Sequence, residues 1–461
     1  MATISPEAVL LANERRGRLL RVLGVSFGLA VTIGGVIGMG ILRTPGEVAS
    51  ELPRTWLFIG VWLVGGLYAL LGTISVAELG AMIPRSGGFY IFARRAFGQY
   101  AGFVIGWSDW LSTCGTTAAV ALVIGEYTTA LFPALGGLDI PVAVFATVAF
   151  AVLQWRGVRW GGRTQEITSL LKAVAFIALI TACFVLGNRS NVVTGDVAQS
   201  ASTNVLVSFA LFSGIIKALQ GVIYTYDGWY NLIYFGEEVR EPQRNIPRSM
   251  ISSVALVIAI YVLVNLALLY VLPLSGIAGQ KLAVGAAANA IFGNYGGSII
   301  AALATISMLS TVNANNLIAP RILFAMSRDG LFSEKAVKVN RGGTPTVTLF
   351  VSTLVAVLFI VLSQRLEKVF AVLAFFFVIN YGVTFLSVFI LRRREPDTPR
   401  PFRAWGYPWT TGLVLLGSIA FLIGAFMDDP QDGIYVFILL AASYPAFLLL
   451  RYVSLRKQAT E

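Results

Sequence analysis

The sequence predicts an all-α integral membrane protein with about twelve transmembrane helices, of which the first and the sixth are discontinuous. Hydrophobic residues make up 57% of the 461-residue chain and charged residues only 12%. The mean hydropathy of +0.78 is far above that of soluble domains. Apolar runs long enough to cross a bilayer recur along the whole chain. Two of these runs are interrupted near their middle, the first by glycines and the sixth by Asp227 and Gly228.

Each expected span is followed by a short connection. The spans are 22–50, 55–82, 99–132, 139–156, 166–187, 208–236, 249–273, 283–313, 346–364, 369–391, 411–427 and 433–452. The longest hydrophilic stretches, 237–248, 325–345 and 392–409, leave no room for a soluble catalytic domain. The first 20 residues have neither an apolar core nor a small-residue cleavage site, so we expect no removed signal peptide.

Lys and Arg are distributed unevenly between alternate connections. Most of the 34 Lys and Arg residues lie in the terminal segments and in the connections on the same side of a twelve-span chain. Because basic residues in short loops stay in the cytoplasm, we predict a multi-pass plasma-membrane protein with both termini cytoplasmic. This topology explains the net charge of +11, so nucleic-acid binding is not expected.

The residue composition also argues against redox and metal chemistry. The two cysteines, Cys114 and Cys183, lie in apolar spans without metal-ligand spacing and are expected to be packing residues. The chain has no His, which is the commonest transition-metal ligand and the usual proton carrier near neutral pH. We therefore expect no cofactor and no bound metal.

The stretch "GGVIGMGIL" at 34–42 places four glycines inside the first span. Backbone at membrane depth must be paired unless it is buried in protein or lines a wet cavity, although glycines also serve close helix packing. The stretch "YTYDGWYN" at 224–231 interrupts the sixth span, and a charged residue at mid-membrane is usually functional.

The two breaks lie five spans apart, which predicts two five-helix inverted repeats with substrate between them. The first repeat is expected at 22–187 and the second at 208–391, followed by two further helices at 411–452. The segments 1–21 and 453–461 are then the cytoplasmic N-terminal segment and C-terminal tail.

Broken helices expose backbone groups that bind ligands. The free N–H groups around Gly38, Met39, Gly40 and Ile41 carry a partial positive charge, which suits a carboxylate. Free carbonyl groups that end the neighbouring half-helices, near Val36 and Tyr224, suit an ammonium group. One site can therefore bind both ends of an α-amino acid.

Four blocks carry a resemblance to a known family. They are "GGVIGMGIL", "AELGAMIPRSGGFY" (77–90), "YDGWYNLIYFGEEVREPQRNIPRS" (226–249) and "RILFAMSRDG" (321–330). With these blocks the chain resembles the amino acid-polyamine-organocation superfamily, in its L-amino-acid transporter branch and of bacterial type. The resemblance implies carboxylate contacts through the amides of Gly38, Met39 and Gly40.

The resemblance also implies ammonium contacts through the carbonyls of Val36, Tyr224 and Asp227, with Thr225 in the same substrate-binding segment. Tyr224 stands where the family has an aromatic gate, although it could instead be an aromatic packed against neighbouring helices. Met39 replaces a residue that is often Ser in the family, so a side-chain hydrogen bond to the carboxylate is lost. The role of Asp227 is open: it could pair with a cationic substrate, titrate with a coupled proton, or cap nearby backbone.

Lys172 lies in the apolar fifth span, where a charged ammonium pays a large desolvation penalty unless it is paired. In the family, a lysine at this place puts its amine where sodium-coupled relatives bind the ion. The resemblance therefore implies sodium independence, with Ser307, Ser310 or Thr311 as possible partners. The alternative is that Lys172 extends to the cytoplasmic surface.

Other acidic residues are expected to pair rather than to bind substrate. Asp109 and Glu126 in the third span could assist protons, but pairing with polar groups inside the membrane is favoured. Three glutamates, Glu78, Glu237 and Glu238, lie near the cytoplasmic ends and close in sequence to basic residues, so ion pairs are expected there. The nearby basic residues are Arg85, Arg240 and Arg244.

Together these features predict a sodium-independent secondary transporter of L-α-amino acids that works by alternating access, through exchange or with a proton. Eukaryotic relatives attach a glycoprotein through a cysteine between the third and fourth spans, and the loop 132–141 has none, so no disulfide-linked heavy subunit is expected. A polyamine or other organic cation is the alternative substrate. A channel is a second class, but no ring of pore residues is evident, and a membrane enzyme lacks His and any soluble domain.

Overall fold

The described part of the chain is built almost entirely of helices. The computed structural model describes residues 18–187, 205–363, 367–428 and part of 431–448, with backbone only at 205–210, 367–374 and 428. Within these residues there are α-helices, short 3-10 helices and isolated bridges, but no β-strand. The predicted all-α class is confirmed.

The number of candidate membrane spans agrees with the prediction. Eight helices of the described residues are long and apolar enough to cross a membrane, and a pair bent by 44° forms a ninth span. Three shorter apolar helices, Leu211–Thr225, Thr346–Val361 and Ile434–Pro445, bring the candidates to twelve.

The helices follow the apolar runs along the chain. In order they are α2 (Val25–Val36), α3 (Gly40–Glu51), α4 (Thr55–Met82), α5 (Phe89–Phe97), α6 (Gln99–Leu131), η1 (Pro133–Leu135), α7 (Asp139–Arg156), α8 (Val158–Leu186), α9 (Val205–Thr225), η3 (Asn231–Tyr234), α10 (Pro242–Val271), α11 (Leu274–Ile277), α12 (Ala283–Phe292), η4 (Gly293–Tyr295), α13 (Gly296–Arg328), η5 (Glu334–Val337), α14 (Thr346–Val361), α15 (Glu367–Arg394) and α16 (Trp409–Asp428).

Two predicted spans need correction. The predicted eighth span, 283–313, joins two helices, because α12 ends at Phe292 and the long helix α13 continues to Arg328. Its charged residue Arg321 is buried and paired with Glu238, so α13 runs on where a hydropathy pattern stops. In the predicted sixth span, 208–236, the α-helix ends at Thr225 and gives way to turns and η3.

Other helices begin earlier than predicted. α8 starts at Val158 rather than 166, and α10 at Pro242 rather than 249. Proline is well tolerated in the first turn of a helix because its missing N–H would be unpaired there. The amphipathic first turns of both helices lie outside the purely apolar runs that defined the predicted spans.

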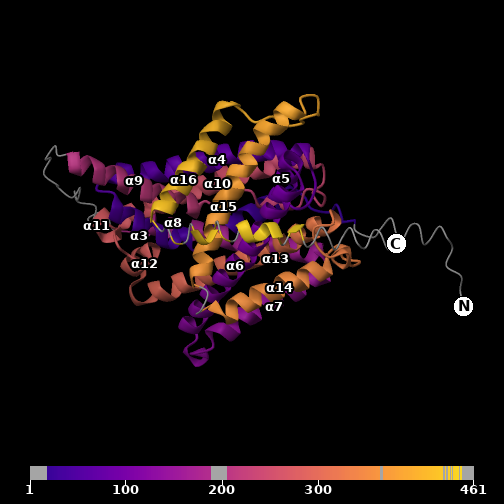
Figure 1. The fold of residues 1–461 in the computed structure, drawn as a ribbon. Coiled ribbons are helices and arrows are strands. Elements are labelled where there is room, and N and C mark those ends of the chain that lie inside the picture. Colours follow the sequence, from indigo (N-terminus) through magenta and orange to yellow (C-terminus); the bar gives the residue numbers. More distant parts are fainter. Residues whose placement is uncertain are drawn as a thin grey trace, which may run out of the picture.

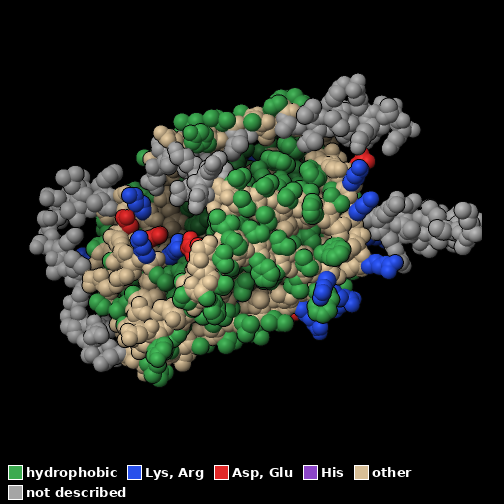
Figure 2. All heavy atoms as spheres, turned by 90° about the horizontal axis from the view of Figure 1, so that it is seen from below, with side chains coloured by type: hydrophobic (Ala, Val, Ile, Leu, Met, Phe, Trp, Pro, Cys, Tyr) green, Lys and Arg blue, Asp and Glu red, His purple; other side chains and the backbone are tan. Residues whose placement is uncertain are grey.

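The broken first span packs against helices from both halves of the chain. α2 packs against α8, α10 and α13, and α3 packs against α9 and α12. Figure 1 shows α3, α9, α11 and α12 gathered at one end, with α5 at the other. Hydrophobic side chains cover the middle of the face in Figure 2, with Lys and Arg toward its two ends, as a bilayer-embedded protein requires.

Candidate functional site

The first break leaves four backbone amides without partners. α2 ends at Val36 and α3 begins at Gly40, and the Ile37 amide still bonds to Ile33 O, 3.0 Å away. No hydrogen-bond acceptor for the amides of residues 38–41 is found among the described residues. These are the N–H groups of Gly38, Met39, Gly40 and Ile41, which were predicted to be free.

The second break touches the first. Gly228 has a φ of +99°, and a Cβ atom on it would lie 3.0 Å from the carbonyl carbon of Gly35 and 3.1 Å from the amide nitrogen of Val36. On the other side of the break, a Cβ atom on Gly40 would lie 3.1 Å from Cα of Thr225. The glycines therefore serve both proposed purposes, since they allow the two breaks to make backbone contact and leave polar groups free.

Tyr261 of α10 joins the two breaks, and sequence reasoning missed it. Its hydroxyl lies 2.8 Å from Val36 O and 3.1 Å from Thr225 O, the carbonyls at the ends of α2 and α9. A tyrosine hydroxyl has one proton to donate, so only one of these carbonyls can receive it at a time. A hydroxyl-bearing side chain inside a long apolar run was the available signal in the sequence.

The carbonyl of Tyr224 is also partly engaged. It accepts a hydrogen bond from the Asp227 amide at 3.1 Å. A carbonyl oxygen has two lone pairs, so Val36 and Tyr224 can each accept one further bond. The side chain of Thr225 is buried, and its hydroxyl lies 2.8 Å from both Gly221 O and the hydroxyl of Thr44.

Lys172 of α8 lies completely buried against the first break. Its ammonium donates to Gly34 O at 2.8 Å and to Ile37 O at 2.5 Å, and Thr311 Oγ1 lies 3.5 Å away. Because the side chain is 0% exposed, the alternative in which it extends to the surface is wrong. The contacts connect α8 with α2 and α13, as the position in the fifth span predicted.

Two hydroxyls complete the surroundings of this ammonium. Ser307 donates to Ile37 O and Thr311 donates to Gly34 O, both at 3.0 Å. Ser310, the third predicted partner, instead bonds to Ser169 and Gln165. The carbonyls of Gly34 and Ile37 therefore each receive one ammonium bond and one hydroxyl bond.

The α3 and α9 end of the molecule has exposed side chains close to the break and a cleft further along the helices. The side chain of Tyr224 is 55% exposed, which argues against its interpretation as a packed aromatic. Arg43 is exposed on α3, only about 4.5 Å along the helix from the break. Charged side chains within membrane spans face water-filled cavities or pair with polar groups. A cleft of about 380 Å³ lies further along the same two helices, lined by Glu47, Val48, Ser50, Glu51, Lys217, Ala218 and Gly221.

The opposite end, which contains α5, is closed by ion pairs. Glu238 and Arg321 are at most 1% exposed and make two hydrogen bonds of 2.9 Å. Glu237 bonds to Arg328, and Glu78 bonds to Arg392. The predicted ion pairs therefore form, but with partners distant in sequence rather than with the predicted Arg85, Arg240 and Arg244.

Asp329 gathers further groups at this closed end. It accepts from Arg94 at 2.7 Å and from the hydroxyl of Tyr90 at 2.8 Å, with Arg85 at 3.6 Å. Burial, and then the nearby Asp329 carboxylate, raise the pKa of Tyr90 far above its usual range, so this hydroxyl keeps its proton and donates to Asp329.

Backbone bonds also hold the beginning of α2 at the closed end. Leu23 N donates to Glu238 O at 2.9 Å, and Arg240 N donates to Leu23 O at 2.8 Å. The segment before α2 is thereby paired with the segment after η3. Both broken spans are therefore joined to each other at the closed end, beside the buried pair of Glu238 and Arg321.

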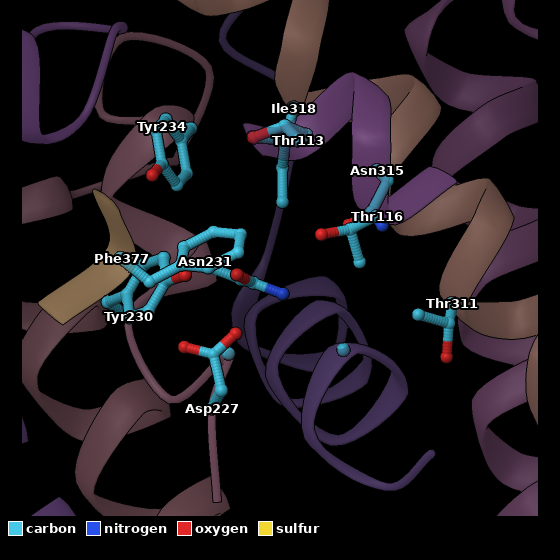
Figure 3. A pocket seen from close by; sticks show the side chains of 12 residues that line it. Thr113, Thr116, Asp227, Tyr230, Asn231, Tyr234, Thr311, Asn315, Ile318 and Phe377 are labelled. Carbon is cyan, nitrogen blue, oxygen red and sulfur yellow. The ribbon is translucent and has the colours of Figure 1, made fainter. Parts of the chain in front are cut away.

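Asp227 lines a second, much smaller cavity beside the two breaks. Its volume is about 40 Å³, and Figure 3 shows the side chains around it. The Asp227 carboxylate is bonded by the Tyr230 side chain and the Gly228 amide, which agrees with a backbone-capping contribution. The cavity is lined by Gly35, Thr113, Thr116, Asp227, Gly228, Tyr230, Asn231, Tyr234, Thr311, Asn315, Ile318 and Phe377.

The two acids of the third span differ from each other. Asp109 is fully buried, and both of its carboxylate oxygens lie 3.0 Å from the hydroxyl of Tyr234. This is the predicted pairing with an intramembrane polar group. Glu126 is exposed.

Comparison with known proteins identifies a family that the chain matches. A family model described as "Amino acid permease" matches residues 23–444. The chain is 30% identical to the serine/threonine exchanger SteT of Bacillus subtilis, over 92% of this chain and 95% of that protein. It is 28% identical to the mouse large neutral amino acids transporter small subunit 2, over 87% and 75% of the two chains.

A third relative, the mouse b(0,+)-type amino acid transporter 1, is 26% identical over 89% of this chain and 84% of its own length. All three relatives are named for amino acids, and so is the family model. The comparisons therefore give no support to the polyamine alternative. They also agree with a transport protein rather than an enzyme or a channel.

Proposed function

This chain belongs to the amino acid permease family, and from that premise we propose that it exchanges L-α-amino acids across the plasma membrane by alternating access, without sodium. The four free amides at residues 38–41, beside the carbonyl ends of α2 and α9, are the observation that carries this proposal. The carboxylate of the substrate binds these amides, and the ammonium of the substrate binds the carbonyls.

The arrangement around Tyr261 leaves a carbonyl acceptor available for the substrate ammonium. Because this hydroxyl can donate to only one of the carbonyls of Val36 and Thr225 at a time, the other carbonyl can accept a further hydrogen bond. A substrate ammonium carries three donors and can supply the missing bond. The contacts predicted for Val36 and Tyr224 then add to bonds that these carbonyls already accept.

Sodium independence rests on Lys172. Its ammonium lies among the carbonyls of Gly34 and Ile37 and the hydroxyls of Ser307 and Thr311. These oxygens would otherwise suit a small hard cation. A cation that is covalently part of α8 replaces an ion that would have to bind and leave in each cycle.

Alternating access follows from the open and closed ends of the molecule. We assign the closed, Arg-rich end to the cytoplasm on the positive-inside rule, so both termini are cytoplasmic and the structure is open to the outside. The repeats 22–187 and 208–391 move against each other around the fixed site. Tyr224 closes over the bound substrate before the ion pairs at the inner end separate.

The chain is expected to act without a partner subunit. Its loop 132–141 contains no cysteine for a disulfide to a heavy subunit. The exchange mode is suggested by the Bacillus subtilis relative, which is named an exchanger. Coupling to a proton is the alternative mode for the same site.

The test is counterflow in proteoliposomes made with purified protein. Vesicles loaded with unlabelled amino acids should take up labelled amino acid in buffer that contains choline and no sodium. Vesicles without internal amino acid should take up little, and addition of sodium should not raise the rate. Uptake that requires sodium, or that is independent of internal amino acid and does not saturate, would contradict the proposal.

A further inference from the structure

The small cavity at Asp227 lies directly beside the site proposed for the amino acid head group. Gly35 and Gly228, which make the backbone contact between the two breaks, both line it. Its other walls come from α6, α13 and α15, through Thr113, Asn315 and Phe377. A substrate held by its carboxylate and ammonium at the breaks would place its side chain in this cavity.

Two side chains around the cavity hold polar atoms that lack partners. Oδ1 of Asp227 is a buried acceptor, and Nδ2 of Asn315 is a buried donor, and neither has a hydrogen-bond partner among the described residues. Asn315 is 8% exposed. In Figure 3 the two side chains lie on different sides of the cavity, on the segment after α9 and on α13. Unpaired buried polar atoms are uncommon in folded proteins, and each needs an explanation such as a functional role, a bound water or an ion.

The chemistry of these two atoms identifies the group that would satisfy both. A hydroxyl donates one hydrogen bond and accepts others, so it can donate to the Asp227 carboxylate while it accepts from the Asn315 amide. The terminal torsions of Asp and Asn are soft, which lets both side chains turn toward a small ligand. Thr113 and Thr116 of α6 also line the cavity and add two hydroxyls to its lining.

We propose that this cavity binds the side-chain hydroxyl of the transported amino acid, so that L-serine and L-threonine are the preferred substrates. This inference rests on the proposed function, because it places the amino acid head group at the two breaks. Asp227 then acts as a specificity-determining residue and Asn315 as its partner.

The size and charge of the cavity exclude other classes of side chain. A volume of about 40 Å³ has room for about three water molecules, which matches the two or three heavy atoms of a serine or threonine side chain and is too small for leucine or lysine. A carboxylate side chain would be repelled by Asp227. An apolar side chain of the right size would leave the donor and the acceptor unpaired.

The first experiment uses the unaltered protein and isosteric pairs. Labelled L-serine uptake into preloaded proteoliposomes is measured against unlabelled threonine, valine, serine, alanine and leucine. Threonine should compete roughly 10- to 100-fold more strongly than valine, and serine more strongly than alanine, because only the hydroxyl pairs both polar atoms. Threonine should also raise the melting temperature of purified protein more than valine at equal concentration.

The second experiment removes the acceptor. Asp227→Asn should reduce the ratio of threonine to valine affinity by at least about tenfold, and Asn315→Ala should act in the same direction. Asp139→Asn is the matched control, because Asp139 lies at the start of α7 and does not line the cavity. The ratio should not change in that variant.

The outcomes separate this inference from the proposed function. If amino acids exchange but valine or leucine competes as well as threonine, the hydroxyl assignment is wrong and the exchange function stands. If the ratio of threonine to valine affinity in Asp227→Asn equals that of the unaltered protein, Asp227 does not bind the substrate side chain. If no amino acid supports counterflow or shifts the melting temperature, the proposed function itself fails.

Discussion

Replacement of Lys172 by alanine is the most informative perturbation of the proposed mechanism. The ammonium makes two bonds to the carbonyls of Gly34 and Ile37, at 2.8 and 2.5 Å, and is fully buried. Alanine removes both bonds and leaves a space that water or a cation can enter. These carbonyls lie at the end of α2, so without the two bonds α8 no longer holds the first break in its orientation.

The expected loss of activity in Lys172→Ala follows from the hydrogen bonds that are lost and those that remain. A hydrogen bond to a charged group contributes about 1.5–3 kcal/mol. Both carbonyls keep a hydroxyl donor, from Thr311 and Ser307 at 3.0 Å, so the lower limit is appropriate for each. Two such bonds give about 3 kcal/mol, which corresponds to roughly a 100-fold loss in the population of the transport-competent arrangement.

The assay is sodium-free counterflow by equal amounts of inserted protein, with surface labelling to verify insertion. Lys172→Met tests whether the volume or the charge of the side chain matters, and it should be as inactive as Lys172→Ala. Lys281→Met is the matched control on an exposed lysine and should transport normally. Addition of sodium, but not choline, should restore part of the activity of Lys172→Ala. Full activity of Lys172→Met without sodium would show that the buried ammonium is not needed for transport.

Three further changes test the framework around the site. Gly228→Ala should lower the melting temperature more than Gly137→Ala: both have positive φ, which costs alanine about 1–2 kcal/mol, but only Gly228 also presses a Cβ atom on backbone. Tyr261→Phe should destabilise the protein by about 1 kcal/mol in thermal unfolding, since it removes the hydrogen bond that this hydroxyl donates to Val36 O or Thr225 O. Arg321→Ala should destabilise the protein by about 3–5 kcal/mol in thermal unfolding, because it leaves Glu238 buried and unpaired; a loss below about 1 kcal/mol would contradict that pairing.

The backbone features of the site could be predicted from local sequence. Glycines in an apolar run, and an acid beside Gly228 in another, identified both breaks, because membrane-depth backbone has few ways to be unpaired. The burial of Lys172 followed from its place in an apolar span. These predictions needed no knowledge of which helices are neighbours.

Features that depend on contacts between distant segments could not be predicted in the same way. Arg321 reads as a loop residue until Glu238, 83 residues earlier, is known to pair with it inside the protein. Tyr261 reads as a core aromatic until the carbonyls of Val36 and Thr225 are found beside its hydroxyl. The 3-10 turn of η3 likewise depends on tertiary packing, since its residues are as apolar as those of a helix.

The central claim is that backbone groups at the two breaks bind the head group of an amino acid, and a structure of the protein with L-serine bound tests it most directly. In that structure the carboxylate oxygens should lie about 3 Å from amides of residues 38–41, with the ammonium against carbonyls at the ends of α2 and α9. A carboxylate held by a basic side chain such as Arg43 or Lys217, away from these amides, would contradict it.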